Sequence, residues 1–351
     1  PYTSAYIHRG IDIASAGWVV NVANGTYNED VNVNKALTLK GESRDATILK
    51  GVYSTAGAST LSMSVSNSLA KDFTVSYNYG STLAQWQASN KTGVNLLDGS
   101  VIDNLWVKDH RNGVYANNRQ NWVVKNSIIS DNRTGIQLVN NVSGGKVENN
   151  FIKDNFSHGV LFNVFASTNF VGTNLKITNN SIYNNWYSQV AMQQAGTGVL
   201  GDLAGFEVSC NWYGLIPPVY GNVAAGEPGY ATQIPSQFGG TDPNVNQDVM
   251  GNYASNIPYI PWLTEGADAS SDPGFTPSIA CSSPCTLTIS ASATIAHCPL
   301  RNDGTASVTV TTGGNSPSYL WTPGGYTTPM ISGLTAGTYC VTAVSYTHLA
   351  G

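Results

Sequence analysis

The chain has 351 residues, a formal net charge of −5 at pH 7 and only 11% charged side chains, whereas about a quarter of an average soluble domain is charged. Gly, Ser, Thr and Asn take the place of the missing charges, and because they are poor helix formers the composition excludes a largely helical protein. The 8 Trp, 18 Tyr and 9 Phe can form a core, which argues against simple disorder.

The composition also argues against two kinds of partner, nucleic acid and the membrane interior. Only 16 Lys and Arg are present, so we expect no binding of nucleic acid. No apolar run reaches the roughly 18 residues that cross a membrane, so we expect no membrane span. The length suits one large and one small domain. Because the chain begins at Pro1 without a signal peptide, we expect a processed product or a fragment.

The N-terminal segment has a distinctive order of turns and alternating stretches. A Gly-Thr-Tyr turn at residues 25–27 is followed by an alternating strand, a turn at Lys35 and a second strand that ends in Gly41. This segment resembles the opening coils of pectin-lyase-like β-helix proteins. The resemblance implies that residues 6–14 form a short helix that caps the open end of the core.

Self-similar segments then recur along the middle of the chain. Each begins with Asn and carries Asp five residues later, except that Asn184 takes the Asp place in the last copy. The copies are 22, 23 and 30 residues apart and start at Asn104, Asn126, Asn149 and Asn179. Short stretches with β-branched residues between Asn, Asp and Gly turns are typical of strands.

A repeat of about 22 residues with two or three short strands is typical of one coil of a solenoid. A leucine-rich repeat has a similar period, but its Leu consensus is absent. We therefore predict an all-β chain whose residues 1–275 form a right-handed parallel β-helix, similar to NosD-like and polymorphic β-helix repeats. Coils stack about 4.8 Å apart, so we expect an internal amide ladder of Asn104, Asn126, Asn149 and Asn179.

The end of the solenoid is indicated by two further segments. Residues 210–214, Cys-Asn-Trp-Tyr-Gly, resemble a late coil of secreted bacterial β-helices, and residues 257–266, with Pro-Trp-Leu, resemble their closing segment. Residues 215–256 are rich in Pro and Gly and contain no repeat. We expect them to be an insertion or a loop that lies over the last coils.

A second module follows a change of composition. Residues 270–278 read as a linker, and we place the linker region at 276–285. Alternating strands over 286–344 predict a small immunoglobulin-like β-sandwich, and about residues 286–343 resemble the SprB repeat of Bacteroidota cell-surface adhesins. The tail 345–351 breaks this pattern and looks like adapter-derived sequence from metagenomic reads. We expect the natural protein to continue, and we leave the tail uninterpreted.

The five cysteines, at positions 210, 281, 285, 298 and 340, fit neither a dense disulfide scaffold nor a zinc site. We predict a disulfide between Cys281 and Cys285 that closes a small loop at the domain junction. Such a bond indicates an exported protein, so the expected location is extracellular or on the cell surface.

The pectin-lyase-like superfamily includes pectate lyases, pectin methylesterases, polygalacturonases and alginate epimerases, whose sites lie on one exposed face. The resemblance makes the column Asp109, Asp131 and Asp154 a candidate catalytic site or Ca²⁺ site, because hard oxygen ligands suit that ion. Nearby candidates are Arg111, Arg133 and His158, although we expect His110 and His158 to be surface residues. The alternative, which we favour, is that Asp serves a turn there, as Asn184 would.

Aromatic residues of the repeats are candidates for carbohydrate binding, because flat rings stack on sugars. The candidates are Trp86, Trp106, Trp122, Trp186 and Tyr187. The alternative, which we favour, is that they pack inside the solenoid or under its loops.

Two functions remain open at this stage. The first is a secreted or cell-surface protein that binds polysaccharide or another surface through a β-helix and an adhesin-type repeat. The second is a polysaccharide lyase or glycoside hydrolase that acts on the β-helix face. We favour the non-enzymatic binding or structural role, because the repeats show no converging acid, base and cation groups.

Overall fold

The computed structural model describes residues 6–53, 59–79, 82–88, 90–165, 169–195, 198–214, 216–221, 238, 248–281, 288–294, 301–312 and 317–344, and the statements below concern these residues. The chain divides into two compact units, residues 1–282 and 283–351. Cys285, Cys298 and the tail 345–351 lie outside the described residues.

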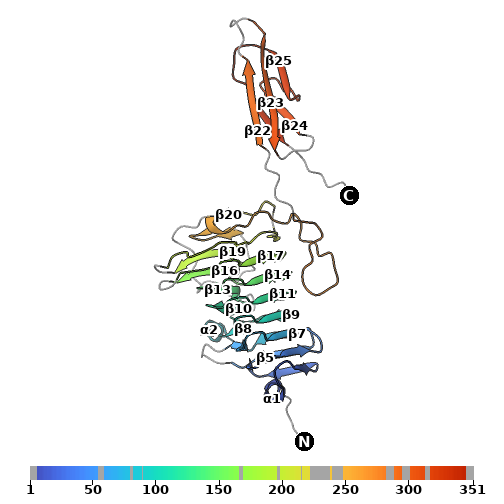
Figure 1. Cartoon of the computed structure of the whole chain (residues 1–351), viewed down its shortest axis with the longest axis vertical. Coiled ribbons are helices and arrows are strands. Elements are labelled where there is room, and N and C mark those ends of the chain that lie inside the picture. The colour runs from blue at the N-terminus through green and yellow to red at the C-terminus, as the bar shows by residue number, and fades with distance from the viewer. Residues whose placement is uncertain are drawn as a thin grey trace. The chain divides into compact units, whose positions relative to one another are not determined.

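The first unit is a parallel β-helix in which each strand pairs with the equivalent strand of the next coil (Figure 1). Its larger sheet is bent lengthwise into two faces. The first face contains β1 (Val19–Val22), β4 (Thr38–Gly41), the start of β7 (Leu69–Tyr77), the start of β9 (Val101–Val107), β11 (Val123–Lys125), β14 (Lys146–Glu148) and β17 (Lys176–Thr178). The second face contains β2 (Gly25–Asn28), β5 (Thr47–Gly51), the ends of β7 and β9, β12 (Ile128–Ser130), β15 (Phe151–Lys153) and β18 (Ser181–Tyr183).

A separate parallel sheet forms the third face of the solenoid. It contains β3 (Val31–Val33), β6 (Ser59–Met63), β8 (Thr92–Asn95), β10 (Asn112–Asn117), β13 (Thr134–Val139), β16 (His158–Phe165), β19 (Ser188–Ala195), β20 (Tyr220–Gly221) and β21 (Val249–Met250). Since β20 and β21 extend this sheet beyond β19, parts of the segment 215–256 continue the stack. Most of the remainder of that segment is outside the described residues.

A short helix covers the first coil, as the resemblance implied. In α1 (Ile7–Ile13) the side chains of Ile7 and Ile11 are buried in the core. Glu29 accepts a hydrogen bond from the backbone N–H of Ile7 at one end of the helix, and Lys35 donates from Nζ to the carbonyl oxygen of Ala14 (2.8 Å) at the other. The helix is thus held at both ends by side chains of the coil that it covers.

Two further short helical segments follow within the described residues, namely α2 (Leu83–Ala88) and the 3₁₀ turn η3 (Ala254–Asn256). In front of α2, Thr82 Oγ1 accepts from the N–H of Gln85 (3.3 Å), and Gln85 Oε1 accepts from the N–H of Thr82 (3.2 Å). This capping box, Thr-x-x-Gln, was readable in the sequence as a helix start.

Each strand buries one side of its alternating pattern, and equivalent residues of successive coils stack in the interior. One such column is completely buried and consists of Leu39, Ala70, Ile102, Val124, Val147 and Ile177. Because each coil supplies the partner for the next, burial is continuous along the solenoid axis, and the all-β prediction is confirmed for this unit.

The internal amide ladder exists, but the prediction placed it one residue too early. Asn150 Nδ2 donates to Asn180 Oδ1 (2.9 Å), and Asn180 Nδ2 donates to Asn211 Oδ1 (2.9 Å). A second ladder runs through Asn132, Asn155 and Asn185. All these side chains are buried, and they satisfy backbone groups of the bends.

The four predicted ladder residues instead occupy the bend between the first and second faces, where the backbone turns left-handed. Their φ angles are +52° to +59°, for Asn104, Asn126, Asn149 and Asn179. Asn is among the few residues that adopt this conformation readily. The recurrent Asn therefore makes the bend, and the residue after it points inward.

The interpretation of residues 270–278 as a linker is wrong. Residues 264–281, here called the strap, form a hairpin within the first unit: the N–H of Ala269 donates to the carbonyl of Thr276 (2.8 Å), and Asp268 pairs with Pro277. Pro, Gly and Ser serve the turns of this hairpin. It appears as the orange-brown loop beside β14 in Figure 1.

The predicted pairing of Cys281 with Cys285 is also wrong, because Cys281 forms a disulfide with Cys210, at a Cα–Cα distance of 5.3 Å. Cys210 has φ +57° and occupies the bend position of the coil after Asn179. The disulfide thus ties the strap to the last coil. Among the described cysteines, Cys340 has a free, exposed thiol.

The second unit consists of antiparallel strands in two sheets. The larger contains β22 (Thr288–Thr294), β23 (Gly304–Thr312) and β25 (Met330–Leu334), and the smaller contains β24 (Ser318–Thr322) and β26 (Cys340–Val344). Its core includes Trp321, Val308 and Ile331. The immunoglobulin-like arrangement and the SprB repeat stay predictions.

Candidate functional site

The second face of the solenoid presents two columns of outward-facing side chains between its bends. The first, here called the apolar column, consists of Thr26, Ile48, Thr74, Trp106, Ile128, Phe151, Ser181 and Trp212. The second, here called the basic column, consists of Asn28, Lys50, Ser76, Lys108, Ser130, Lys153 and Tyr183. Its lysines occur on every second coil, which places them roughly 9–10 Å apart along the face.

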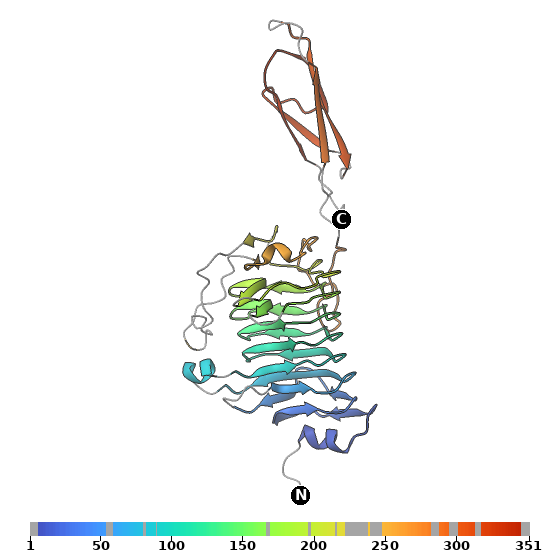
Figure 2. The same ribbon diagram turned by 60° about the vertical axis from the view of Figure 1, so that its left-hand side comes forward.

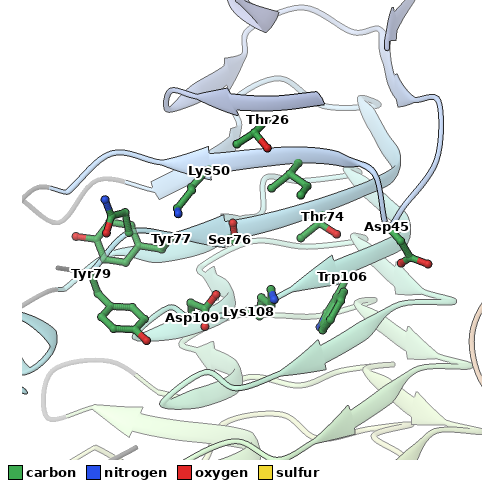
Figure 3. Close-up of a pocket in the computed structure, with 12 residues that line it drawn as sticks. Thr26, Asp45, Lys50, Thr74, Ser76, Tyr77, Tyr79, Trp106, Lys108 and Asp109 are labelled. Carbon is green, nitrogen blue, oxygen red and sulfur yellow. The ribbon is translucent and has the colours of Figure 1, made fainter. Parts of the chain in front are cut away.

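A groove of about 550 Å³ lies over the N-terminal half of these columns. Figure 3 shows its floor, where Thr26, Thr74 and Trp106 follow one another along the solenoid, with Ile48 on the coil between Thr26 and Thr74, and Lys50 and Lys108 lie beside them. Tyr77 and Tyr79 line one side and Asp45 lies on the other. The groove therefore combines aromatic rings, ammonium groups and hydroxyl groups on one open surface.

Trp106 is held in place by two interactions. Its indole Nε1 donates to Ser130 Oγ (2.9 Å), and the ammonium group of Lys108 lies 4.2 Å from the centre of its ring. The indole is partly exposed to the groove. A fixed and partly exposed indole beside a cation can stack on a sugar ring with little loss of side-chain entropy.

Asp109 is the carboxyl group of the groove with a shifted pKa. Burial disfavours its charged form and raises the pKa to about 6, the neighbouring Asp131 contributes in the same direction, and Lys108 and Lys50 oppose the shift. A carboxyl group that titrates near pH 6 can accept or donate a proton near neutral pH. Asp109 is therefore the residue of the groove best suited to acid–base chemistry.

Asp109→Asn is expected to stabilise the first unit at neutral pH but not in acid. Asp109 keeps its proton up to about pH 6 in the folded protein, whereas the ordinary value is 3.8. Ionisation thus favours the unfolded chain as the pH rises through this window, and the cost is complete above pH 6. Because Asn carries no ionisable group, the substitution removes this cost and should add on the order of 1–3 kcal/mol to the free energy of unfolding at neutral pH.

Urea unfolding of Asp109→Asn and wild type at about pH 8 and about pH 3.5 measures this difference. Asp131→Asn is the matched control, since Asp131 is exposed and stands at the equivalent turn of the next coil. We expect it to change stability by less than about 0.5 kcal/mol. Equal effects of both substitutions at neutral pH would contradict a burial cost at Asp109.

The structure aligns the predicted Asp column at a turn. Asp109, Asp131, Asp154 and Asn184 have φ of +54° to +71°, the left-handed conformation that Asp and Asn tolerate. Two of the carboxylates have partners of their own, because Asp131 accepts from Ser130 Oγ (2.7 Å) and Asp154 lies 3.0 Å from Lys153 Nζ. Within the described residues no three His, Cys, Asp or Glu side chains are grouped so as to hold a metal ion.

The other catalytic candidates do not line the groove. Arg111, Arg133 and His158 lie beyond the Asp turn, where the chain enters the third face. The expectation that His110 and His158 are surface residues is wrong, because both are buried, and burial lowers the pKa of each to about 3. His158 Nδ1 is hydrogen-bonded to Ser188 Oγ (2.8 Å), in a role internal to the sheet.

The aromatic candidates divide into two groups. Trp86 and Trp122 are buried and unable to stack on a ligand, whereas Trp106, Trp186 and Tyr187 are partly exposed. Trp186 stacks on Tyr187, with ring centres 6.1 Å apart. Of the five candidates, Trp106 lines the groove.

Several residues in and around the groove were not predicted from the sequence. Lys50, Tyr77 and Tyr79 belong to coils before the recognisable repeats, and Asp45 lies in a turn. Phe238, from the segment 215–256, reaches Tyr79 with ring centres 5.7 Å apart. Aligning the early strands with the later repeats would have placed Lys50 above Lys108, but no sequence signal brings Phe238 to this side of the molecule.

Comparisons with known proteins agree with this fold. A family described as "Right handed beta helix region" matches residues 59–202, and no curated protein sequence matches the chain. Within the described residues, no helix is both long and apolar enough to cross a membrane.

Three solved structures show a weak similarity to the chain, each with a TM-score below 0.5. A mutant pectin methylesterase in complex with hexasaccharide IV has 16% identity and a TM-score of 0.36, with 55% of this chain and 63% of that chain covered. Carrot pectin methylesterase has 12% identity and a TM-score of 0.37, with 59% and 76% covered. ORF18 of Geobacillus virus E2 has 12% identity and a TM-score of 0.34, with 95% and 74% covered.

This chain thus spans less than two thirds of the first of these proteins. The stacked parallel strands and the family match identify the first unit as a right-handed parallel β-helix.

Proposed function

We propose that this protein binds polysaccharide in the groove of the second face, outside the cell or on its surface. The observation that carries the proposal is the partly exposed Trp106, fixed by Ser130 and Lys108 on the floor of an open groove. Polysaccharides bind along extended surfaces, and a groove that runs across several coils offers equivalent positions to successive sugar rings. The third and first faces are not required for this role.

The charges of the groove favour an acidic polysaccharide. Lys50 and Lys108 contribute two ammonium groups, and the carboxylate of Asp45 is engaged by Arg44 (2.8 Å), so the groove is positive below about pH 6, where Asp109 keeps its proton. The protein as a whole has a net charge of −5, so these two lysines place cations on one surface of an acidic chain. Carboxylate or sulfate groups on alternate sugars would meet the lysines of alternate coils.

Binding of the whole chain to immobilised acidic and neutral polysaccharides tests the proposal. We expect acidic polymers to bind more tightly, and Trp106→Ala to weaken binding about tenfold or more because it removes the ring at the centre of the floor. Lys108→Gln should raise the Kd and reduce the salt dependence of binding. Circular dichroism confirms that each variant is folded.

Two controls locate the binding to the groove. Trp186→Ala removes a partly exposed indole outside the groove, and Lys125→Gln removes a lysine of the first face. Both should bind as wild type does. If Trp106→Ala bound equally well, or if the controls lost as much affinity, the groove would not be the binding site.

An enzyme of the lyase or glycoside hydrolase class is the second candidate, and the raised pKa of Asp109 is the observation that favours it. Asp109 would transfer a proton to or from the bound sugar. Incubation with the polymers that bind, followed by measurement of reducing ends and unsaturated products, tests this activity. Asp109→Asn should then abolish cleavage and retain binding, whereas binding without any product supports the non-enzymatic role.

The second unit keeps its proposed role as an adhesin-type repeat. Its antiparallel strands and its core around Trp321 are compatible with that role. The groove proposal does not depend on it, because every residue of the groove belongs to the first unit.

A further inference from the structure

The apolar column continues well beyond the groove, but its C-terminal part is covered. The strap crosses Trp212 at Gly266, where a Cβ atom would overlap the indole ring. Further along, Phe275 is completely buried and lies edge-on against Phe151, with ring centres 5.5 Å apart. The same kind of outward-facing ring that faces the groove at Trp106 is therefore packed against the strap at Phe151 and Trp212.

The strap is anchored firmly along this path. The N–H of Phe275 donates to the carbonyl of Asn149 (2.9 Å), and Gly274, with φ +91°, lies so close to Asn126 and Asn149 that no side chain would fit. At its base the strap is fixed by the disulfide of Cys281 and by a hydrogen bond from Ser278 to Glu265. Its position is thus determined by backbone contacts at the bend and by a covalent bond.

The tip of the strap forms the end wall of a second hollow of about 440 Å³. Arg44, Asn104 and Ile128 line it from the solenoid, and Ser271 and Asp272 line it from the strap. Asp45 lines both this hollow and the groove, so the two are adjacent along the second face. At the opposite end Thr26 is exposed, and the groove is open there.

We propose that the strap sets the length of polysaccharide that the groove accommodates and faces one end of the bound segment. This inference rests on the proposed function. The open columns extend from the coil of Thr26 to that of Ile128, and a sugar ring of an extended chain is about as long as the spacing of coils. The site therefore takes about four to five rings. Hydroxyl groups at the last ring would meet the polar side chains around Asp45.

Binding of oligosaccharides of increasing length tests this inference. The probes are oligogalacturonides and, as the neutral series, (1→4)-linked gluco-oligosaccharides, from dimers to decamers, titrated against the whole chain. We expect affinity to rise with each ring up to about four to five rings and then to change less than about twofold. In Phe275→Ala and in Gly274→Val, which displace the strap, affinity should continue to rise with longer chains.

Ser271→Ala is the matched control, because it changes the tip without altering the contacts of Phe275 or Gly274, and its length limit should stay that of wild type. Faster proteolytic cleavage within the strap verifies its displacement in the other two variants, and circular dichroism verifies their fold. An affinity that rises steadily to decamers in wild type would overturn the inference alone. A length limit equal to that of wild type, in a variant whose strap is displaced, would also overturn this inference. Absence of binding by any saccharide would overturn the proposed function and this inference with it.

Discussion

Replacement of Asn155 by Ala is expected to lower the free energy of unfolding of the first unit by about 3–5 kcal/mol. The Asn155 side chain is completely buried and donates to the carbonyl groups of Ile129 and Lys153 (3.1 Å each) and to Asn185 Oδ1 (2.8 Å). Its own Oδ1 accepts from the backbone N–H of Asn132 (3.1 Å). Alanine would remove the side-chain partner of the buried N–H of Asn132 and of the two carbonyl groups, in a place where water does not replace it.

Urea unfolding followed by tryptophan fluorescence measures the loss. The matched control is Asn184→Gly, because Asn184 lies one residue before the ladder, is exposed and has φ +54°, which glycine adopts without strain. That change should cost less than about 1 kcal/mol. If the two substitutions were equally destabilising, the ladder would not contribute more than the bend residues to the free energy of unfolding of the solenoid.

Removal of the disulfide between Cys210 and Cys281 is expected to cost about 4 kcal/mol, because it closes a loop with a sequence separation of 71 residues and restricts the unfolded chain accordingly. The double substitution Cys210→Ser and Cys281→Ser should lower the melting temperature of the first unit, and reduction of the wild type should do the same. The strap would also lose the covalent bond at its base.

Cys340→Ser is the control, since the thiol of Cys340 is free and lies in the second unit. It should leave the melting of the first unit unchanged. Peptide mapping of the unreduced protein should recover Cys210 and Cys281 in one cross-linked fragment. Recovery of Cys281 linked to Cys285 instead would contradict the structure.

The sequence by itself determined the repeat and therefore the class of fold. Spacings of 22 and 23 residues, alternating β-branched residues and recurrent Asn and Asp predicted stacked coils, and the structure and the family match confirm them. Asn184 in the place of Asp also favoured a turn role for the Asp column, and the positive φ angles agree with it. Such features are local, because periodicity and turn conformation depend on near neighbours in the chain.

The face that each residue presents was decided only by the tertiary structure. Two adjacent asparagines at 149 and 150 are equivalent by composition, yet one forms the bend and the next forms the ladder. A shift of one residue in a strand exchanges its buried and exposed sides. The sequence pattern does not mark which of the two begins the new strand, and for this reason the predicted ladder was displaced by one residue.

Contacts between segments far apart in the chain could likewise not be predicted from the sequence. The strap reads as a linker from its Pro, Gly and Ser, and only the packing of Phe275 on Phe151 and the bond between Cys281 and Cys210 show that it belongs to the solenoid. The groove joins Lys50 and Trp106 from coils that share no motif. Local pattern specifies the coil, whereas the stacking of coils and the return of a distant segment decide which side chains meet and which part of the face stays open.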